Sequence, residues 1–285
     1  MEDIPLYIGK RKNILVLSGG GVKGLATLGA LKCLMDNEII IKPDIICGTS
    51  CGSIIGLFII IGWSPFDIYN LLLSIDFSQL IQPDYDNIFE DTCFGFNTTD
   101  PIMHIVIKML EKKNIEKKIT FKELYDKFKV NLIITGSCVN DANPYYFSKD
   151  TKPDMQVLKA IRISISVPIL FKPYKYDNKI WIDGGCIDNY PIQLFHDRIN
   201  DVIGILLDDY NEYIDNIDEI DKYIMRIFKC LNKSTILYKY EKYQKNTIHI
   251  KCKFDTNINW QITNEQKQYL WNQGIDATTK FISGF

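Results

Sequence analysis

The pattern of hydrophobic and polar positions predicts strands that alternate with helices in the first part of the chain. Residues 14–17 and 44–47 are short runs dominated by residues that favour strands, as expected for strands buried in a parallel sheet. Leucines at helical spacing follow Gly24, and the dense apolar stretch 53–61 follows the second run. Two strand–turn–helix units so close together indicate an α/β protein with a mainly parallel central sheet.

The rest of the pattern predicts a longer series of elements, interrupted by one irregular segment. That segment, 74–118, is either an insertion or a cap over the functional site. A threonine followed three residues later by Glu or Gln, the capping box that opens a helix, occurs at positions 120 and 263. We expect strands at 131–134, 145–148, 179–182, 202–207 and 248–252, and helices at 120–128, 155–165, 217–243 and from 263 onward.

Length and composition favour one large domain over residues 1–285. A chain of this length buries roughly three quarters of its unfolded surface, so a large core is available without metals or disulfides. The net charge is −2, and lysines alternate with acids, as they do in 108–129. This pattern argues against nucleic acid as a partner.

The cysteines and the apolar windows indicate the compartment. The eight cysteines have irregular spacings without a C-x-x-C pair, which favours free thiols in a reducing compartment over a disulfide framework or a zinc site. Residues 1–12 and the short apolar run after them do not make a signal peptide. The most apolar window, 54–63, is too short to span a bilayer. We therefore expect a cytoplasmic protein without a transmembrane segment that can still touch membranes at their surface.

The first of three glycine-containing turns follows strand 14–17 and consists of Gly19, Gly20, Gly21, Val22, Lys23 and Gly24. It fits the dinucleotide-binding pattern G-x-G-x-x-G, in which an acid at the end of the second strand binds a ribose hydroxyl. Asp44 lies at the right distance for this acid, but it begins its strand instead of ending it. Backbone N–H groups of such a loop, placed before a helix, converge on a phosphate or on a developing oxyanion. Lys23 adds positive charge nearby. The alternative is a tight turn that only packs a strand on a helix.

The second turn, Gly48-Thr49-Ser50-Cys51-Gly52, lies between a predicted strand and a predicted helix. In that context G-x-S-x-G is a nucleophile elbow, in which the serine hydroxyl is exposed on a strained turn and the small residues allow the reversal. Ser50 is therefore the candidate nucleophile. Cys51 is a second candidate, but it lies one residue past the apex, and we interpret it as a packed thiol.

A serine nucleophile needs a base, and the three histidines are poorly placed for that role. His104 belongs to an apolar periodic segment, His196 to a predicted surface helix and His249 to a predicted strand. The third turn, Asp183-Gly184-Gly185, follows strand 179–182 and supplies a carboxylate instead. A carboxylate has an ordinary pKa of about 3.9 and becomes a competent base when burial raises that pKa and the serine hydroxyl is held beside it.

The three turns, in this order, resemble the patatin-like phospholipases, whose pattern is a glycine-rich oxyanion loop, a Gly-x-Ser-x-Gly elbow and an Asp-Gly-Gly or Asp-Gly-Ala turn. Segment 160–173 before the aspartate strand and Asp188-Asn189-Tyr190-Pro191 after the turn are also similar to that family. The resemblance covers residues 12–207 and implies that they are the core of the domain, with 208–285 as an extension of helix and strand. Two positions depart from the family pattern, since Cys51 replaces a smaller residue and Ser18 replaces an aspartate.

The resemblance implies a three-layer α/β/α fold and a Ser–Asp dyad that needs no histidine, metal or cofactor. Ser50 would attack an ester carbonyl, and Asp183 would accept its proton and later activate water on the acyl-enzyme. Amides of Gly20, Gly21 and their neighbours would hold the oxyanion. The implied activity is that of a serine lipid acyl hydrolase of the carboxylic-ester class, acting on phospholipids or related glycerolipids at a membrane or micelle surface.

Three other functions remain open from the sequence. The chain could be a small-molecule carboxylesterase or thioesterase that never meets an interface, or a lipid- or partner-binding protein that keeps the fold without turnover. A nucleotide-binding function would rest on the first glycine turn alone. The lysine- and isoleucine-rich composition is typical of proteins from AT-rich genomes, such as those of large DNA viruses.

Overall fold

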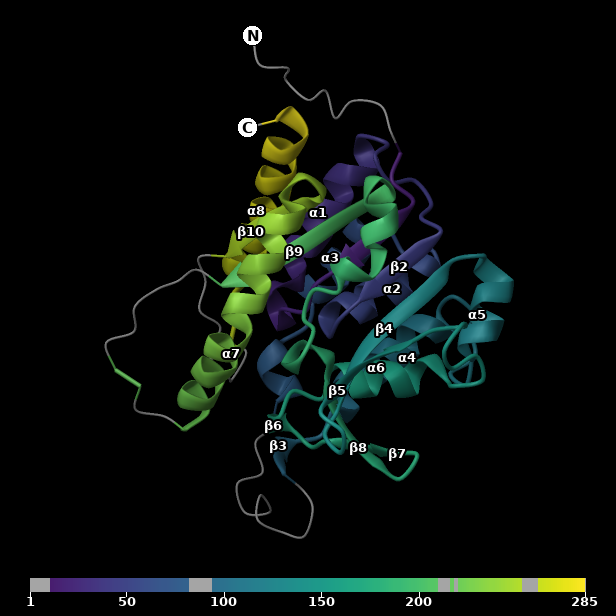
Figure 1. The fold of residues 1–285 in the computed structure, drawn as a ribbon, viewed down its shortest axis with the longest axis vertical. Coiled ribbons are helices and arrows are strands. Elements are labelled where there is room, and N and C mark those ends of the chain that lie inside the picture. Colours follow the sequence, from purple (N-terminus) through teal and green to yellow (C-terminus); the bar gives the residue numbers. More distant parts are fainter. Residues whose placement is uncertain (1–10, 82–93, 210–215, 218–219, 253–260, 285) are drawn as a thin grey trace.

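The computed structural model describes residues 11–81, 94–209, 216–217, 220–252 and 261–284, which Figure 1 draws in colour. Two segments discussed from the sequence therefore lie partly outside the described residues. They are residues 1–10 of the N-terminal segment 1–12, and residues 82–93 of the expected insertion or cap.

Among the described residues, eight strands form one sheet in the order β10-β9-β1-β2-β4-β8-β7, with β5 beside β4. Five strands are parallel to one another, namely β1 (Ile14–Leu17), β2 (Ile45–Gly48), β4 (Asn131–Cys138), β9 (Val202–Asp209) and β10 (Thr247–Cys252). Three run antiparallel at one side, namely β5 (Asn143–Phe147), β7 (Tyr174–Tyr176) and β8 (Lys179–Asp183). A separate parallel pair consists of β3 (Gly95–Asn97) and β6 (Ile169–Phe171). The predicted mainly parallel sheet is confirmed.

The helices fall close to the predicted ranges, with two additions. Predicted helices appear as α1 (Gly24–Asp36), α2 (Cys51–Ile60), α5 (Phe121–Phe128), α6 (Val157–Ser164), α7 (Ile220–Tyr243) and α8 (Asn264–Ser283). Both predicted capping boxes are present, at Thr120 and Thr263. The additional helices are α3 (Pro65–Leu73) and α4 (Asp100–Glu111). Each has a proline in its first turn, where the missing N–H costs nothing, so these prolines begin helices instead of marking irregular chain.

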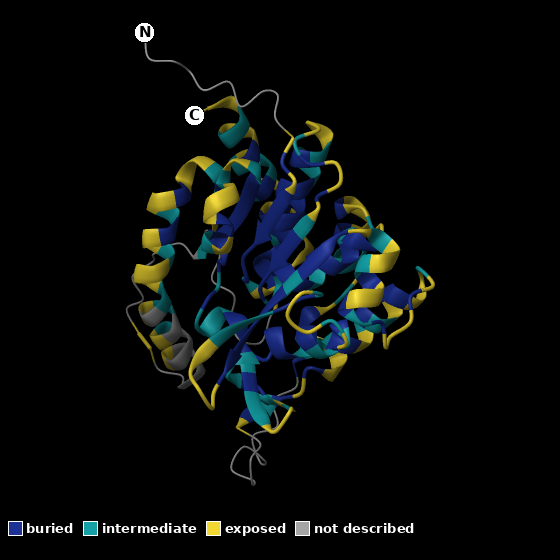
Figure 2. Ribbon diagram, turned by 45° about the vertical axis from the view of Figure 1, so that its right-hand side comes forward, coloured by how far each residue is buried: buried dark blue, intermediate teal, exposed yellow. Residues whose placement is uncertain are grey.

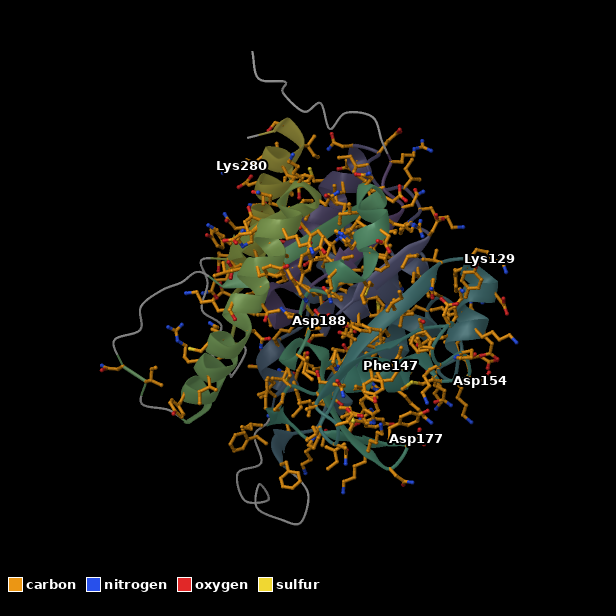
Figure 3. All side chains as sticks on the ribbon, in the orientation of Figure 1. Lys129, Phe147, Asp154, Asp177, Asp188 and Lys280 are labelled. Carbon is orange, nitrogen blue, oxygen red and sulfur yellow. The ribbon has the colours of Figure 1, made fainter. Side chains whose placement is uncertain are left out.

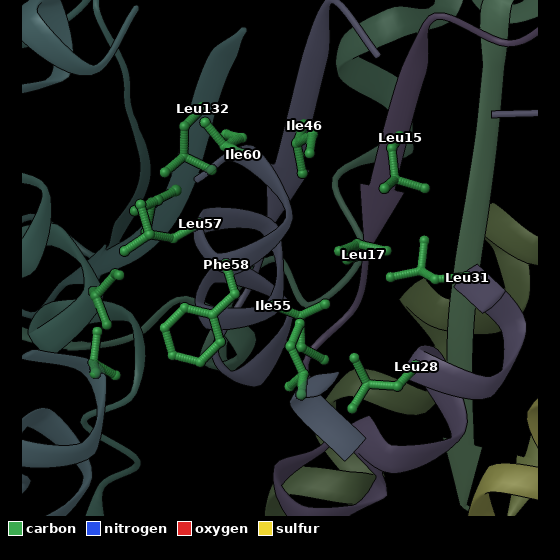
Figure 4. Close-up of a cluster of buried hydrophobic side chains, with 14 of the residues drawn as sticks. Leu15, Leu17, Leu28, Leu31, Ile46, Ile55, Leu57, Phe58, Ile60 and Leu132 are labelled. Carbon is green, nitrogen blue, oxygen red and sulfur yellow. The ribbon is translucent and has the colours of Figure 1, made fainter. Parts of the chain in front are cut away.

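Both faces of the sheet are covered, which gives three layers. Leu15 and Leu17 of β1 belong to a large cluster with α1 and α2, part of which is drawn in Figure 4. Ile14 and Val16 point to the other face and join a second cluster with residues of α7 and of the 3₁₀ segment η4 (Ile192–Asp201). Figure 2 shows the buried strands as a dark blue layer between these helices. The predicted three-layer α/β/α fold is confirmed.

The final helix packs closely on the first one. A Cβ added at Gly274 of α8 would lie 1.9 Å from the carbonyl oxygen of Ala26, and one added at Gly29 of α1 would lie 2.1 Å from that of Trp271. The two backbones approach closely only because glycine stands at both positions. Among the described helices, none combines the length and the apolar character that crossing a bilayer requires.

Candidate active site

The glycine loop and the serine turn lie side by side because they follow neighbouring parallel strands. Leu17, the last residue of β1, pairs with Gly48, the last residue of β2. The carboxyl ends of parallel strands meet at one edge of a sheet, where sites of α/β proteins form. The chain crosses from β1 through the 3₁₀ turn η1 (Gly21–Lys23) into α1, and from β2 through Ser50 into α2.

The serine turn has the strained geometry expected of a nucleophile elbow. Ser50 has φ 51° and ψ −125°, a backbone conformation that residues other than glycine rarely adopt. A Cβ at Gly48 would lie 2.5 Å from the carbonyl oxygen of Gly52, and a Cβ at Gly52 would lie 2.7 Å from that of Leu17. Both glycines of G-x-S-x-G are therefore required by close backbone contacts. The Ser50 amide donates to Oγ of Ser164 at 2.9 Å, which ties the turn to α6.

The glycine loop is held by Asn189. The Gly19 amide donates to Oδ1 of Asn189 at 3.2 Å, and Nδ2 of Asn189 donates back to the Gly19 carbonyl at 3.4 Å. A Cβ at Gly19 would lie 3.0 Å from Cβ of Ser50, so the loop passes directly against the serine. Gly21 has φ +56°, which favours glycine, and Val22, Lys23 and Gly24 continue into α1. This arrangement places the backbone amides of the loop beside the predicted nucleophile.

Cys51 lies against the same amides. Burial raises the pKa of its thiol to about 12, and the charge of Asp183 adds to the rise, while the backbone N–H groups of Gly20, Gly21 and Gly52 lower it. The thiol is therefore protonated near neutral pH and is a poor nucleophile. Its sulfur would also lie 3.2 Å from a Cβ at Gly24, which shows how tightly it packs under the loop.

Asp183 reaches the site from an antiparallel strand. β4 continues past the level of Gly48, whose partner is Ile134, and β8 runs back along this extension until Asp183 pairs with Gly136. The carboxyl end of β8 thus arrives beside the serine turn from the opposite direction. The Asp183 amide donates to the Ser166 carbonyl at 2.8 Å, and its Oδ1 accepts from the Gly185 amide at 2.6 Å. Gly184 and Gly185 form the short turn η3 (Gly184–Cys186).

The environment of Asp183 gives its carboxyl the properties of a base that works near neutral pH. The residue is 4% exposed, and burial raises its pKa to about 7, while hydrogen bonding to the Ser50 side chain and to the Gly185 amide lowers it. Its Oδ2 is buried and has no hydrogen-bond partner of good geometry among the described residues. Because unsatisfied buried oxygens are rare, this atom marks a place where a ligand or a proton belongs.

The three histidines lie away from this constellation. His104 is exposed on α4. The exposed His196 has its Nδ1 3.4 Å from the Tyr243 hydroxyl. His249 of β10 pairs with Asp208 at 2.9 Å between Nε2 and Oδ2. None of these three residues, all of which the structure describes, lines the cavity that contains Ser50.

Ser50 and Asp183 open into one cavity of about 440 Å³, which is within the range of small-molecule sites. Much of its wall is apolar and comes from α2, α3, α4 and the segment 165–171, with Phe58, Leu72, Ile105 and Phe171 as examples. The described parts of the segment predicted as an insertion or cap thus form cavity wall. Gly19 to Gly24, Asn189 and Cys186 also line the cavity, and α7 supplies a polar wall.

A family model described as patatin-like phospholipase matches residues 15–196. The chain belongs to this family. The match contains all three glycine-containing turns of the patatin-like pattern and ends before α7 and α8. The family assignment confirms the resemblance inferred from the sequence.

Several relatives are viral, in agreement with the lysine- and isoleucine-rich composition. An uncharacterized protein of Acanthamoeba polyphaga mimivirus is 32% identical over 94% of this chain and 93% of its own length. A protein of invertebrate iridescent virus 6, described as a probable lipid hydrolase, is 34% identical over 65% of each chain. The crystal structure of VipD from Legionella pneumophila is similar in fold, with a TM-score of 0.62 and 18% identity over 96% of this chain and 67% of VipD.

Sequence reasoning assigned no role to several residues that hold the site of this patatin-like protein together. Ser164 and Asn189 were quoted only within longer stretches of family likeness, yet each binds the backbone of a glycine-containing turn. Asp188, which is labelled in Figure 3, is buried and accepts hydrogen bonds from Tyr146, Gln193 and Lys239. The sequence signal that could have indicated these roles is that Ser164, Asp188 and Asn189 are polar residues among apolar ones, just before and after the strand that ends at Asp183.

Proposed function

We propose that this protein is a lipid acyl hydrolase that cleaves carboxylic esters of phospholipids or related glycerolipids through a Ser50–Asp183 dyad. Membership of the patatin-like family and a lipid hydrolase among the relatives support a lipid hydrolase activity. The observation that carries the mechanism is the state of Asp183. Its carboxyl is buried, has a pKa raised to about 7 despite hydrogen bonding to the Ser50 side chain, and belongs to a residue that lines the cavity containing that serine.

In this mechanism the Ser50 hydroxyl attacks the ester carbonyl and its proton passes to Asp183. The tetrahedral oxyanion accepts hydrogen bonds from amides of the glycine loop, in which Gly19 passes against Ser50 and the amides of Gly20 and Gly21 lie near Cys51. Collapse expels the alcohol, which takes the proton from Asp183 and leaves an acyl-enzyme. Water then gives its proton to Asp183, attacks the acyl group and releases the fatty acid, and Ser50 recovers its proton. Lys23 lines the same cavity and adds positive charge near the developing anion.

The apolar wall of the cavity supports a substrate with an acyl chain. An acyl chain that leaves water for this wall gains about 0.8 kcal/mol for each buried CH₂ group. We infer that the protein meets its substrate at a membrane or micelle surface as a peripheral enzyme. We also propose that residues 1–285 act as one catalytic domain, because α7 lines the cavity and α8 packs on α1.

The test uses Ser50→Ala and Asp183→Asn proteins with a fluorogenic ester and a phospholipid as substrates. Each variant is expected to lose at least about 10³-fold in kcat, because removing one member of a catalytic unit costs nearly as much as removing the whole unit. Ser283→Ala, a hydroxyl deletion at an exposed position at the end of α8, is the matched control. Full activity of either variant would overturn the dyad.

Two other activities make different predictions. A small-molecule esterase or thioesterase would show no rise in rate above the critical micelle concentration of the substrate, whereas an interfacial lipase would. A binding protein without turnover would not be labelled at Ser50 by a fluorophosphonate probe. The proposed lipid acyl hydrolase predicts both the interfacial rise and the labelling.

A further inference from the structure

Lys267 of α8 is a buried cation that contacts the C-terminal end of α3. The residue is 3% exposed, and its Nζ donates to the carbonyl oxygens of Leu72 at 3.0 Å, Leu73 at 3.2 Å and Ile75 at 2.7 Å. An ammonium group has three N–H donors, and these carbonyls account for all of them. The last carbonyls of a helix have no partner within it, so Lys267 caps α3 from another helix, and its charge suits the negative end of the helix dipole.

The stretch of chain that Lys267 holds is part of the cavity wall. Leu72 lies in the last turn of α3, and Phe77 and Leu80 follow it in a short 3₁₀ helix. All three side chains belong to residues that line the active-site cavity. Nζ of Lys267 also lies 5.0 Å from the centroid of the Phe77 ring, a cation–π contact. We call this stretch, residues 72–80, the α3 wall.

The helix that carries Lys267 is fixed relative to the site. α8 packs closely on α1, which begins within the glycine loop. A second contact joins α8 to the middle of α3, since the rings of Tyr69 and Trp271 lie 4.3 Å apart between centroids. Loss of the Lys267 ammonium group would therefore release the C-terminal end of α3 and leave its middle attached. The family match ends at residue 196, so this device belongs to the part of the chain that follows it.

We propose that Lys267 is a positioning residue that determines acyl-chain specificity, because it holds the α3 wall against the acyl chain and so favours esters of longer chains. This inference rests on the proposed ester hydrolysis at Ser50 and adds a preference for chain length to it. The carbonyl carbon of the substrate must lie beside the Ser50 hydroxyl. A short acyl group ends near that hydroxyl, whereas a longer one extends along the apolar wall, where each further buried CH₂ group is worth about fourfold in binding.

An apolar side chain at position 267 would leave the carbonyls of the α3 wall buried without a donor. Buried carbonyls that have lost their partner are costly, and the chain that carries them shifts until water or another donor reaches them. Such a shift moves Leu72, Phe77 and Leu80 away from the positions in which they line the cavity. Ser50 and Asp183 belong to other elements and would keep their places.

The test compares p-nitrophenyl butanoate with p-nitrophenyl octanoate, which share a leaving group, below the concentrations at which either aggregates. The test variant is Lys267→Met, which keeps a long apolar side chain and removes the ammonium group. Lys280→Met, at an exposed position of the same helix that is labelled in Figure 3, is the matched control. Lys267→Gln, which keeps an N–H donor on a shorter side chain, replaces the test variant if Lys267→Met does not fold.

The measured quantity is kcat/KM for the octanoate divided by kcat/KM for the butanoate. This ratio should exceed one in the wild type. Lys267→Met is expected to lower it about tenfold, as when roughly two CH₂ groups lose their contact with the wall, while kcat/KM for the butanoate stays near the wild-type value. Lys267→Gln is expected to lower the ratio by a smaller factor, and Lys280→Met to keep it.

The contrary outcomes separate this inference from the proposed function. An unchanged ratio in the variant that folds, even with both rates reduced, would show that Lys267 only stabilises the fold, and the hydrolase function would stand. A wild-type ratio of one or less, or a fall in the ratio that Lys280→Met shares, would likewise overturn the role of Lys267. Hydrolysis of neither ester by the wild type would overturn the proposed function and this inference with it.

Discussion

Asn189 holds the glycine loop in place beside Ser50, since its Oδ1 accepts from the Gly19 amide at 3.2 Å and its Nδ2 donates to the Gly19 carbonyl. The same Oδ1 would lie 2.8 Å from a Cβ at Gly185, so this one side chain contacts the turn after β1 and the turn after β8. The side-chain amide of Asn189 thus contacts both the turn that is proposed to stabilise the oxyanion and the turn that is proposed to supply the base. This arrangement makes Asn189 a positioning residue.

We expect Asn189→Ala to lower kcat by about 10- to 100-fold with a smaller change in KM. Loss of the side chain frees the loop, and small misplacements of catalytic groups cost rates of this order. Steady-state kinetics on a fluorogenic ester would measure both constants. Asn272→Ala, at an exposed position of α8, is the control. A variant with wild-type kcat would show that the loop holds its position without Asn189.

The raised pKa of Asp183 predicts the pH dependence of the reaction. The carboxyl must be ionised to accept the Ser50 proton, and burial raises its pKa to about 7. We therefore expect kcat/KM to fall about tenfold for each pH unit below that value and to level off above it. The measurement is a pH–rate profile from pH 5 to 9 on an ester whose own chemistry does not titrate there. A profile that stays flat down to pH 5 would contradict the assignment of the base.

The same pKa makes a prediction about stability. Asp183 binds its proton up to a pKa of about 7 in the folded protein, and only up to about 3.9 in an unfolded chain. Between those values the folded state binds more protons, so the contribution of this group to stability is lost as the pH rises through about 7. Asp183→Asn removes the ionisation. We expect this variant to be more stable than the wild type above pH 7, by on the order of 1–4 kcal/mol, with the difference shrinking toward pH 4.

Denaturant unfolding of both proteins at several pH values measures this difference. Asp154→Asn, at an exposed position labelled in Figure 3, is the matched control and should show no such pH-dependent gain. A difference between Asp183→Asn and the wild type that stays constant from pH 4 to pH 8 would refute the raised pKa.

Cys51→Ala tests which side chain of the elbow is the nucleophile. The Cys51 thiol has a pKa of about 12 and packs under the glycine loop, so we expect its removal to change kcat by no more than about threefold. Iodoacetamide at neutral pH should leave the wild type active for the same reason. A loss as large as that of Ser50→Ala would instead assign the nucleophile to Cys51.

The local parts of the fold and of the site could be predicted because short segments encode them. The capping boxes at Thr120 and Thr263 and the apolar runs of β1 and β2 depend on neighbours a few residues away. The missed helices α3 and α4 show the limit of such rules. A proline in the sequence is compatible both with a loop and with the first turn of a helix, and the residue alone does not distinguish the two.

The long-range parts could not be predicted from any one segment. Asp183 was expected at the carboxyl edge of a sheet, and it does lie beside Ser50, but β8 runs antiparallel to β4. The residue arrives there only because β4 extends beyond the level of Gly48. Likewise, the contact between Lys239 and Asp188 spans 51 positions and places α7 at the cavity.

By itself the sequence determined which backbone turns this protein can form, because Gly48 must pass close to the backbone of Gly52 four residues later and a serine at positive φ needs such small neighbours. Only the tertiary structure decided what those turns do together. Burial by distant elements raises the pKa of Asp183, and the fold places this residue in the wall of the cavity that contains Ser50. The pKa of a buried acid depends on all the atoms that pack around it and exclude water, and those atoms are brought together only by the whole fold.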